Sequence, residues 1–331
     1  MNFSFDTLQT TPTLDDKILW DFLIIGGGPA GLNAALYAQR KGLKTALITS
    51  DIGGQLNNTS AVENYLGFKL MSGHEMAQTF LDHAKSLNIP ILQEVYVLSI
   101  KKHELDYHVM VSDGKTYRTK TLLVATGGLP RKMNIPGEDD YANRGVSYCA
   151  ICDGPFYKNK HIIVAGGGNS AIEAALDLSA FASQITIIHR SQFRADQVLL
   201  YKMKNHPKID YLLETQILEI IGQEKMTGVK ILDKKTNQAS IFEAQGIFIE
   251  IGTIPNAELV LNLVKTNAYG EVIVDENQMT SSPGMYAAGD LTTQPHKQII
   301  ISAAEGAKAA LAANQYIMHH YQGEIYGKTI K

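Results

Sequence analysis

Short apolar runs recur along the chain, and two of them open the same arrangement. At 21–51 (DFLIIGGGPAGLNAALYAQRKGLKTALITSD) an apolar run, a glycine turn, an Ala/Leu-rich stretch with helical spacing and a second apolar run follow one another. A similar series begins at His161 (HIIVAGGGNSAIEAALDLSAFASQITIIHRSQFRADQ). Each series is typical of a strand, a helix and a second strand. The sequence therefore predicts two such units, which form a weak internal repeat.

Two further segments predict strands. LLVATGG at 122–128 predicts a buried strand that leads into a glycine turn. At 282–317 an apolar strand is expected to end at Gly289-Asp290, with a small-residue helix after the polar step that follows. We expect both segments to pack with the first unit.

If they do, the second unit is an insertion. The chain would cross into it near Leu129 and out of it near Gly252. Two short crossings of this kind would allow a hinge between two domains. A length of 331 residues is typical of about two domains.

The glycines of the first unit match a dinucleotide-binding fingerprint. Gly26, Gly28 and Gly31 give G-x-G-x-x-G at the turn from strand to helix. The first glycine allows the tight turn, the second lets a pyrophosphate approach the backbone, and the third lets helix pack on strand. The next strand ends at Asp51, about twenty residues on, where an acid can bind an adenosine ribose.

The second unit carries the same fingerprint with a different ending. Gly166, Gly168 and Ala171 fill its positions. Its second strand ends at His189 and Arg190 instead of an acid, and another arginine follows four residues later. Cationic side chains there suit a 2′-phosphate better than a free ribose diol, so this site is predicted to prefer NADPH.

Composition and charge narrow the classes of partner. The chain is 45 % hydrophobic and 19 % charged, with a formal net charge of -3 and no block of basic residues, so neither nucleic acid nor a membrane surface is expected as a partner. The first twenty residues hold no signal-peptide pattern, and no later segment has eighteen consecutive apolar residues. We expect a soluble, cytoplasmic protein.

The only two cysteines of the chain lie in one motif. Cys149 and Cys152 form a C-x-x-C within SYCAICDG, with Asp153 directly after them. Two cysteines make no disulfide framework, and neither His161 nor His189 stands at a zinc-ligand spacing from them, so no metal site is predicted. In a cytosolic chain such a pair favours redox chemistry over metal binding.

These motifs together resemble a known family. The chain resembles the low-molecular-weight thioredoxin reductases of bacteria and archaea, from Asp21 to about Tyr316, in GGGPAG, GGQL, ENYLG, ATGG, CAICDGP, GGGNSA, HR…FRADQ, EIGTIPN and AAGD…KQIIISAAEG. Two segments, ADQVLLYKMKN and KQIIISAAEGAKAAL, also look like the reductase portion of the alkyl hydroperoxide reductase flavoprotein, which passes electrons to a peroxiredoxin.

The resemblance implies an architecture and a reaction. The fold class is α/β, with two Rossmann-like three-layer ββα-type dinucleotide-binding domains, the second inserted in the first. The FAD-binding domain would comprise 1–128 and 253–331, and 129–252 would be the NAD(P)H-binding domain that carries the C-x-x-C. A homodimer is implied. A hydride would pass from NADPH to FAD and on to the disulfide, and dithiol exchange would then reduce thioredoxin or a thioredoxin-like protein.

The resemblance also implies particular contacts. The FAD contacts fall on Gly26, Gly28, Pro29, Ala30, Gly31, Gly53, Gly54, Gln55, Asn64, Thr126, Gly127, Asp290, Lys297 and Gln298. The pyridine nucleotide contacts fall on Gly166, Gly168, Asn169, Ser170, Ala171, His189, Arg190 and Arg194. The redox pair is Cys149 and Cys152, and Asp153 is the acid that handles the proton; we expect Cys152 to face the flavin. The insert is expected to rotate about its two crossings, presenting nicotinamide and disulfide to the flavin in turn.

Departures from the family pattern keep alternatives open. The motif HRSQFR has one arginine fewer than the usual HRRxxxR, and Ala150-Ile151 stands where Ala-Thr is common. An N-terminal arm precedes the first strand in place of tandem thioredoxin-like domains, so the reduced partner is expected to be a separate protein. The alternatives are an NADH-dependent reductase of a peroxiredoxin or glutaredoxin-like protein, a ferredoxin-reduced flavin thioredoxin reductase, and a flavin-bound redox sensor or scaffold.

Overall fold

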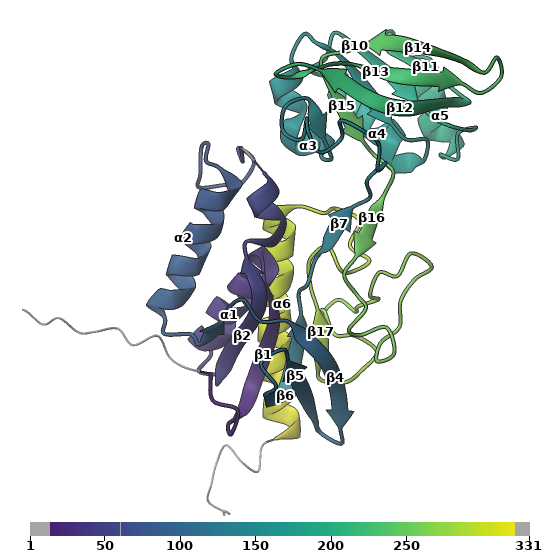
Figure 1. Cartoon of the computed structure of the whole chain (residues 1–331). Helices are drawn as coiled ribbons and strands as arrows, with labels where there is room; N and C mark the ends of the chain where they lie inside the picture. Colours follow the sequence, from purple (N-terminus) through teal and green to yellow (C-terminus); the bar gives the residue numbers. More distant parts are fainter. Residues whose placement is uncertain (1–13, 60, 322–331) are drawn as a thin grey trace, which may run out of the picture. The chain divides into compact units, whose positions relative to one another are not determined.

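The chain divides into two compact units. The computed structural model describes residues 14–59 and 61–321. One unit comprises the residues up to Leu129 and those from Pro255 onward, and the other is the continuous segment Pro130–Ile254. The connecting segments β7 (Gly128–Pro130) and β16 (Thr253–Pro255) pair as a two-stranded sheet (Figure 1). The Arg131 N–H also donates to the Gly252 carbonyl at 2.9 Å, so the two crossings run together.

The first unit is built on a seven-stranded sheet. Its strands are β1 (Leu19–Gly27), β2 (Thr45–Ile52), β3 (Ile91–Leu92), β4 (Val97–His103), β5 (Asp106–Val111), β6 (Thr116–Val124) and β17 (Met285–Ala287). The order is β3-β2-β1-β6-β5-β4, and β17 also pairs with β6. The β1, β2, β3, β6 and β17 strands are parallel, whereas β4, β5 and β6 form an antiparallel meander.

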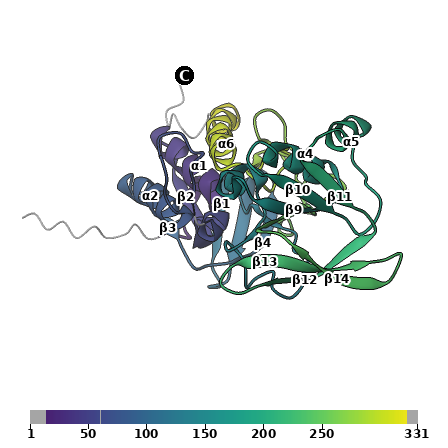
Figure 2. The same cartoon turned by 90° about the horizontal axis from the view of Figure 1, so that it is seen from above.

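Alternation along β1 sends its side chains to two cores. Phe22 and Ile24 lie in the core under the helices, and Leu23 and Ile25 lie in the core on the opposite face. The helices are α1 (Pro29–Arg40), α2 (Gly73–Ser86) and α6 (Ile299–His320), with a 3-10 turn η1 (Gly54–Asn58). The two helices α1 and α6 lie side by side (Figures 1 and 2) because small residues line their contact. Each fully buried Phe or Ile contributes roughly 1.5–3 kcal/mol.

The second unit has two sheets. The parallel sheet contains β8 (Val146–Ser147), β9 (His161–Ala165), β10 (Gln184–Ile188), β11 (Ile209–Leu212) and β15 (Ile247–Ile249), in the order β11-β10-β9-β15-β8. The antiparallel sheet contains β12 (Thr215–Gly222), β13 (Met226–Asp233) and β14 (Gln238–Glu243). The helical segments are α3 (Ala150–Asp153), η2 (Gly154–Tyr157), α4 (Asn169–Leu178) and α5 (Gln197–Lys204).

These elements form three layers. Ile162 and Val164 of β9 pack with α4 and α5, whereas Ile163 and Ala165 pack with the antiparallel sheet. Figure 2 shows the parallel strands between the helices and β12–β14. The predicted fold class, an α/β chain with two Rossmann-like units, is confirmed. Two predicted strand ends move: β17 ends at Ala287, two residues before Gly289, and β10 ends at Ile188, one residue before His189.

Candidate active site

The glycine turn after β1 lies against the loop after β2. The Gly53 N–H donates to the Gly27 carbonyl at 2.9 Å. The Asp51 carboxylate accepts the Gly54 N–H at 3.0 Å, so it holds this second loop in place. Both loops stand at the carboxyl edge of the parallel strands, which is the edge where α/β sheets bind ligands.

The space around the fingerprint glycines differs between the outer positions and the middle one. A Cβ on Gly26 would lie 2.3 Å from the Ala125 carbonyl oxygen, and one on Gly31 would lie 1.9 Å from the Gly26 carbonyl oxygen. The middle glycine, Gly28, has nothing nearer than 3.9 Å and an ordinary φ of -81°. Packing within the fold therefore requires glycine at Gly26 and Gly31. Gly28 instead leaves open a space at the N-terminus of α1, where an anion is stabilised.

A carboxylate completes this edge. Asp290 accepts hydrogen bonds from the Gln55 amide at 2.7 Å and the Ser302 hydroxyl at 3.4 Å. Burial raises the pKa of Asp290, although Lys297, Ser302 and Gln55 lower it. Such a carboxyl group suits hydrogen bonding to a polyol.

The sequence missed the group that holds the Asp290 turn. Glu305 of α6 is 4 % exposed and accepts the Gly289 N–H at 2.7 Å and the Gln294 amide at 3.1 Å. The available signal was one acid inside the Ala-rich stretch SAAEGAKAA.

The remaining predicted flavin contacts fall into two groups. Asn64 and Gln298 meet through an amide hydrogen bond of 3.2 Å, beside the start of α6. The Thr126 hydroxyl and the Lys297 ammonium each have a partner within the protein. Thr126 donates to the Asn256 carbonyl at 2.6 Å, and Lys297 pairs with Glu271 at 3.1 Å. Pro29 and Ala30 are the first two residues of α1, and Gly127 lies in the loop after β6.

The second fingerprint repeats the geometry of the first. Gly166 has a φ of +156°, and a Cβ there would lie 2.3 Å from the Glu250 carbonyl oxygen and 2.7 Å from the Ala171 Cβ. Gly168 has a φ of -96° and nothing within 4 Å of a built Cβ. The middle position again leaves a space at a helix N-terminus, beside Ser170 in the first turn of α4.

The cationic residues after β10 fold back onto this turn. The Arg194 N–H donates to the Gly167 carbonyl at 2.8 Å, and the His189 ring packs directly against Gly167. Burial, then Arg194 and Arg190, lower the pKa of His189. The Asn169 side chain and Asp196 exchange two hydrogen bonds, of 2.8 and 2.9 Å, which tie this loop to α4. The Arg194 backbone therefore lies against the glycine turn, and Arg190 adjoins His189 in the chain.

The cysteine pair stands at the same edge of the second sheet. Cys149 and Cys152 form a disulfide, with their Cα atoms 5.3 Å apart. Cys149 is the N-cap of α3, and its Sγ accepts the Cys152 N–H at 3.2 Å. Backbone N–H groups at such a position stabilise a thiolate once the pair is reduced.

Asp153 is held beside the pair by a strand residue. The Ser147 hydroxyl donates to its carboxylate at 2.6 Å and accepts the Cys149 N–H at 3.1 Å. Burial raises the pKa of Asp153, and the Ser147 hydrogen bond lowers it. A carboxyl group with a raised pKa can hold a proton at higher pH than an exposed one.

A second buried carboxyl group, which no motif signalled, stands at the same edge of the sheet. Glu250 follows β15, which lies between β9 and β8. Burial raises its pKa to about 7, although the backbone of Ala150 lowers it. The signal was a single acid within the apolar run GIFIEIG.

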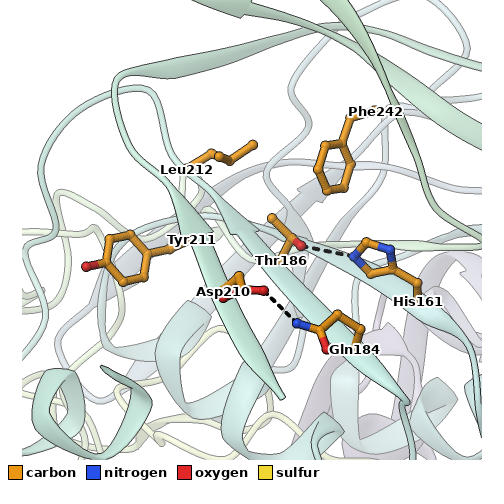
Figure 3. A pocket seen from close by; sticks show the side chains of 7 residues that line it. All are labelled: His161, Gln184, Thr186, Asp210, Tyr211, Leu212 and Phe242. Atoms are coloured by element: carbon orange, nitrogen blue, oxygen red, sulfur yellow. Dashed lines mark hydrogen bonds between the residues drawn. The ribbon is translucent and has the colours of Figure 1, made fainter. Parts of the chain in front are cut away.

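The second unit also has a pocket that is lined by neither the glycine turn nor the cysteine pair. It has a volume of about 770 Å³ and is lined by His161, Gln184, Thr186, Asp210, Tyr211, Leu212 and Phe242. Figure 3 shows two polar pairs in it, His161 with Thr186 and Gln184 with Asp210, at 3.0 and 2.7 Å. His161 and Gln184 begin their strands, and Leu212 ends β11, so the pocket runs along the β11 side of the sheet and contains no residue of the glycine turn.

The described residues contain no group of three or more His, Cys, Asp or Glu side chains that could hold a metal ion. Within 14–59 and 61–321, no helix is long and apolar enough to cross a membrane.

The chain has two Rossmann-like units, and a disulfide lies at the carboxyl edge of the parallel sheet in the second unit. This combination defines a class of redox enzyme. The model of the pyridine nucleotide-disulphide oxidoreductase family matches residues 20–312, and the chain belongs to this family. It is an oxidoreductase of a family that combines a flavin with a pyridine nucleotide.

Particular relatives fall into two kinds. The chain is 38 % identical over 313 residues to an alkyl hydroperoxide reductase component of Staphylococcus epidermidis, covering 94 % of this chain and 62 % of that protein. It is 40 % identical over 309 residues to the component of the same name from Pseudomonas putida, covering 92 % and 59 %. The chain thus spans about three fifths of the length of these curated relatives. The crystal structure of thioredoxin reductase from Streptococcus pyogenes is similar with a TM-score of 0.86 and 36 % identity, covering 91 % of this chain and 99 % of that one.

Proposed function

We propose that the protein is an FAD-dependent NADPH:disulfide reductase that reduces thioredoxin or a thioredoxin-like protein. One observation carries the proposal. The carboxyl edge of the second sheet holds the His189-Arg190 pair after β10, the Gly166 turn after β9 and the Cys149 disulfide after β8. The similarity to a solved thioredoxin reductase supports the choice of partner.

The order of the strands along this edge suits a dinucleotide whose adenosine lies at β10 and whose nicotinamide lies toward β8. The strands lie in the order β10, β9, β15 and β8, and neighbouring strands are about 4.8 Å apart. An adenosine 2′-phosphate at Arg190 and Arg194 and a pyrophosphate at Gly168 would direct the nicotinamide half toward β15 and β8. The disulfide and the reducing end of the nucleotide would then occupy the same side of the unit.

Each part of the chain has a distinct role in this scheme. The Gly28 turn and Asp290 would hold a flavin, which would supply the relay between a two-electron hydride donor and a disulfide. Gly28 leaves room for its pyrophosphate, and Asp290 would orient a polyol. Cys149 and Cys152 take up the two electrons as the sulfur–sulfur bond breaks, and Asp153 would supply a proton to one sulfur. The reduced pair then exchanges with the partner's disulfide through a mixed disulfide.

The two curated relatives favour a second candidate. Both are alkyl hydroperoxide reductase components, which points to a peroxiredoxin-type partner and NADH as the reductant. The cations after β10 argue for NADPH, because no acid stands there to bind a ribose diol. A homodimer and a cytoplasmic location remain predictions.

The test is an anaerobic titration of the purified flavoprotein with NADPH and, separately, with NADH, followed by flavin absorbance. We expect NADPH to bleach the flavin at a lower concentration. Arg194→Gln should weaken the response to NADPH about tenfold and leave NADH unchanged, since a charge-assisted hydrogen bond contributes about 1.5–3 kcal/mol. Lys202→Gln, which removes an exposed cation of α5, is the control. Bleaching by NADH alone would favour the peroxiredoxin reading, and bleaching by neither would contradict both.

A further inference from the structure

A turn of the antiparallel sheet lies against the segment that follows β10. The His189 N–H donates to the Leu212 carbonyl at 2.9 Å, and the Thr215 N–H donates to the His189 carbonyl at 3.0 Å. The main chain of His189 is therefore paired with the residues that lead from β11 into β12. The turn between β13 and β14 joins this contact, because the Lys234 N–H donates to the Glu214 carbonyl at 2.9 Å.

The side chain of Lys234 reaches the cationic segment itself. Lys234 follows the last residue of β13 and is exposed, and its Nζ donates to the Arg190 carbonyl at 3.3 Å. This is a long hydrogen bond for a nitrogen donor, and it uses one of the three N–H groups of the ammonium. Within 14–59 and 61–321 the structure gives the other two N–H groups no partner. The ammonium therefore lies beside the main chain of Arg190 and can bind a further acceptor.

Two acids flank this turn, and each has donors of its own. The Glu214 carboxylate pairs with the Lys235 ammonium at 2.9 Å. The Asp233 carboxylate accepts two backbone N–H groups of its own turn, at 2.7 and 3.1 Å. Among the residues that the structure describes, neither Lys234 nor the two arginines after β10 form an ion pair. Their positive charges are therefore available to an anion.

The segment after β10 supplies only two permanent cations of its own, Arg190 and Arg194. Ser191 is uncharged, and its hydroxyl is hydrogen bonded to His189 Nε2 at 3.0 Å. Lys234 adds a third cation from 44 residues further along the chain than Arg190. The β13–β14 turn thus contributes a charge that no local pattern in the sequence indicates.

We propose that Lys234 is a specificity-determining residue of the nucleotide site, whose ammonium group binds the 2′-phosphate of NADPH together with the Arg190 and Arg194 side chains. The inference rests on the nucleotide site proposed above, but it adds a residue of the antiparallel sheet. A phosphate presents three acceptor oxygens and up to two negative charges. A lysine is a compact charge on a flexible stem, so it can turn from a weak carbonyl contact toward such a group. NADH has a hydroxyl at this position and gains no such ion pair.

The experiment is calorimetric titration of the oxidised holoenzyme with NADP⁺ and, separately, with NAD⁺, at low and at high salt. Lys234→Gln removes the charge, and Lys234→Arg keeps it. The control is Lys225→Gln, which removes an exposed cation from the turn between β12 and β13, at the opposite end of β13.

We expect the wild type to bind NADP⁺ more tightly than NAD⁺. Lys234→Gln should weaken NADP⁺ binding about tenfold, because a charge-assisted hydrogen bond is lost, and leave NAD⁺ binding unchanged. Lys234→Arg and Lys225→Gln should bind both nucleotides as the wild type does. The NADP⁺ affinity of Lys234→Gln should also fall less steeply with salt, since one charge fewer is screened. A lysine that only held the Arg190 carbonyl would lower the affinity by the same factor at both salt concentrations.

The outcomes separate this inference from the proposed function. If Lys234→Gln binds NADP⁺ as tightly as the wild type, or if Lys234→Arg loses as much affinity as Lys234→Gln, the role of Lys234 is wrong while the NADPH site stands. An equal loss in Lys234→Gln at low and high salt would overturn it as well. A wild type that binds NAD⁺ as tightly as NADP⁺ would contradict the NADPH preference itself, and the inference with it.

Discussion

The two middle fingerprint glycines offer a substitution that separates binding from folding. Gly168 has a φ of -96° and a ψ of -175°, and a Cβ would meet no atom within 4 Å. Alanine fits such a backbone and stabilises a protein by about 0.4–1 kcal/mol, because it restricts the unfolded chain. Gly168→Ala should therefore fold at least as well as the wild type.

The same methyl group would stand where we expect the nucleotide pyrophosphate. It would keep the phosphate oxygens away from the N–H groups at the start of α4. Loss of charge-assisted hydrogen bonding costs about 2 kcal/mol, or roughly a thirtyfold loss of affinity. Gly166→Ala should behave differently, because its Cβ would lie 2.3 Å from the Glu250 carbonyl oxygen at a φ of +156°. Strain of this kind costs about 1–3 kcal/mol, so we expect Gly166→Ala to lower stability.

The assay is calorimetric titration of the oxidised flavoprotein with NADP⁺, together with a urea unfolding midpoint and the flavin content of each variant. Gly168→Ala should lose nucleotide affinity while keeping its flavin and its midpoint. Gly28→Ala is the reciprocal control, since it should lose flavin affinity while its second unit still binds NADP⁺. If Gly168→Ala binds NADP⁺ as tightly as the wild type, the pyrophosphate does not lie at this turn and the proposed nucleotide site is wrong.

Two further predictions concern the cysteine motif. Cys152→Ser should keep flavin content and NADPH-dependent flavin bleaching but lose turnover of thioredoxin-type disulfides, because no second sulfur remains to resolve the mixed disulfide; undiminished turnover would refute the assignment of the pair. Ser147→Ala removes a hydrogen bond that lowers the pKa of Asp153, so this pKa, already raised by burial, should rise further. If Asp153 acts as the acid, the alkaline fall of disulfide turnover moves to higher pH in a pH–rate profile, and a fall that stays in place would exclude Asp153 from that role.

The sequence predicted those parts of the fold that local patterns determine. The two strand-turn-helix units, their glycine turns and the cations after β10 follow from periodicity and composition within about forty residues. The side-chain partners were not predictable, because they join residues far apart in the chain. The ion pair between Lys297 and Glu271, at 3.1 Å, is one such partnership. Glu305 accepts the Gly289 N–H, and this acid stands in no motif.

The edge of the second sheet shows why the motif order in the sequence could not reveal the site. Along the chain the candidate positions follow as Cys149, Gly166 and His189. Along the sheet they follow as His189, Gly166 and Cys149, because β15 inserts between β9 and β8. The parallel pairing of β15 with both neighbours brings the ends of β9, β15 and β8 to one edge. The glycine turn and the cysteine pair therefore share an edge only because β15, which follows them by about eighty residues in the chain, pairs with both strands.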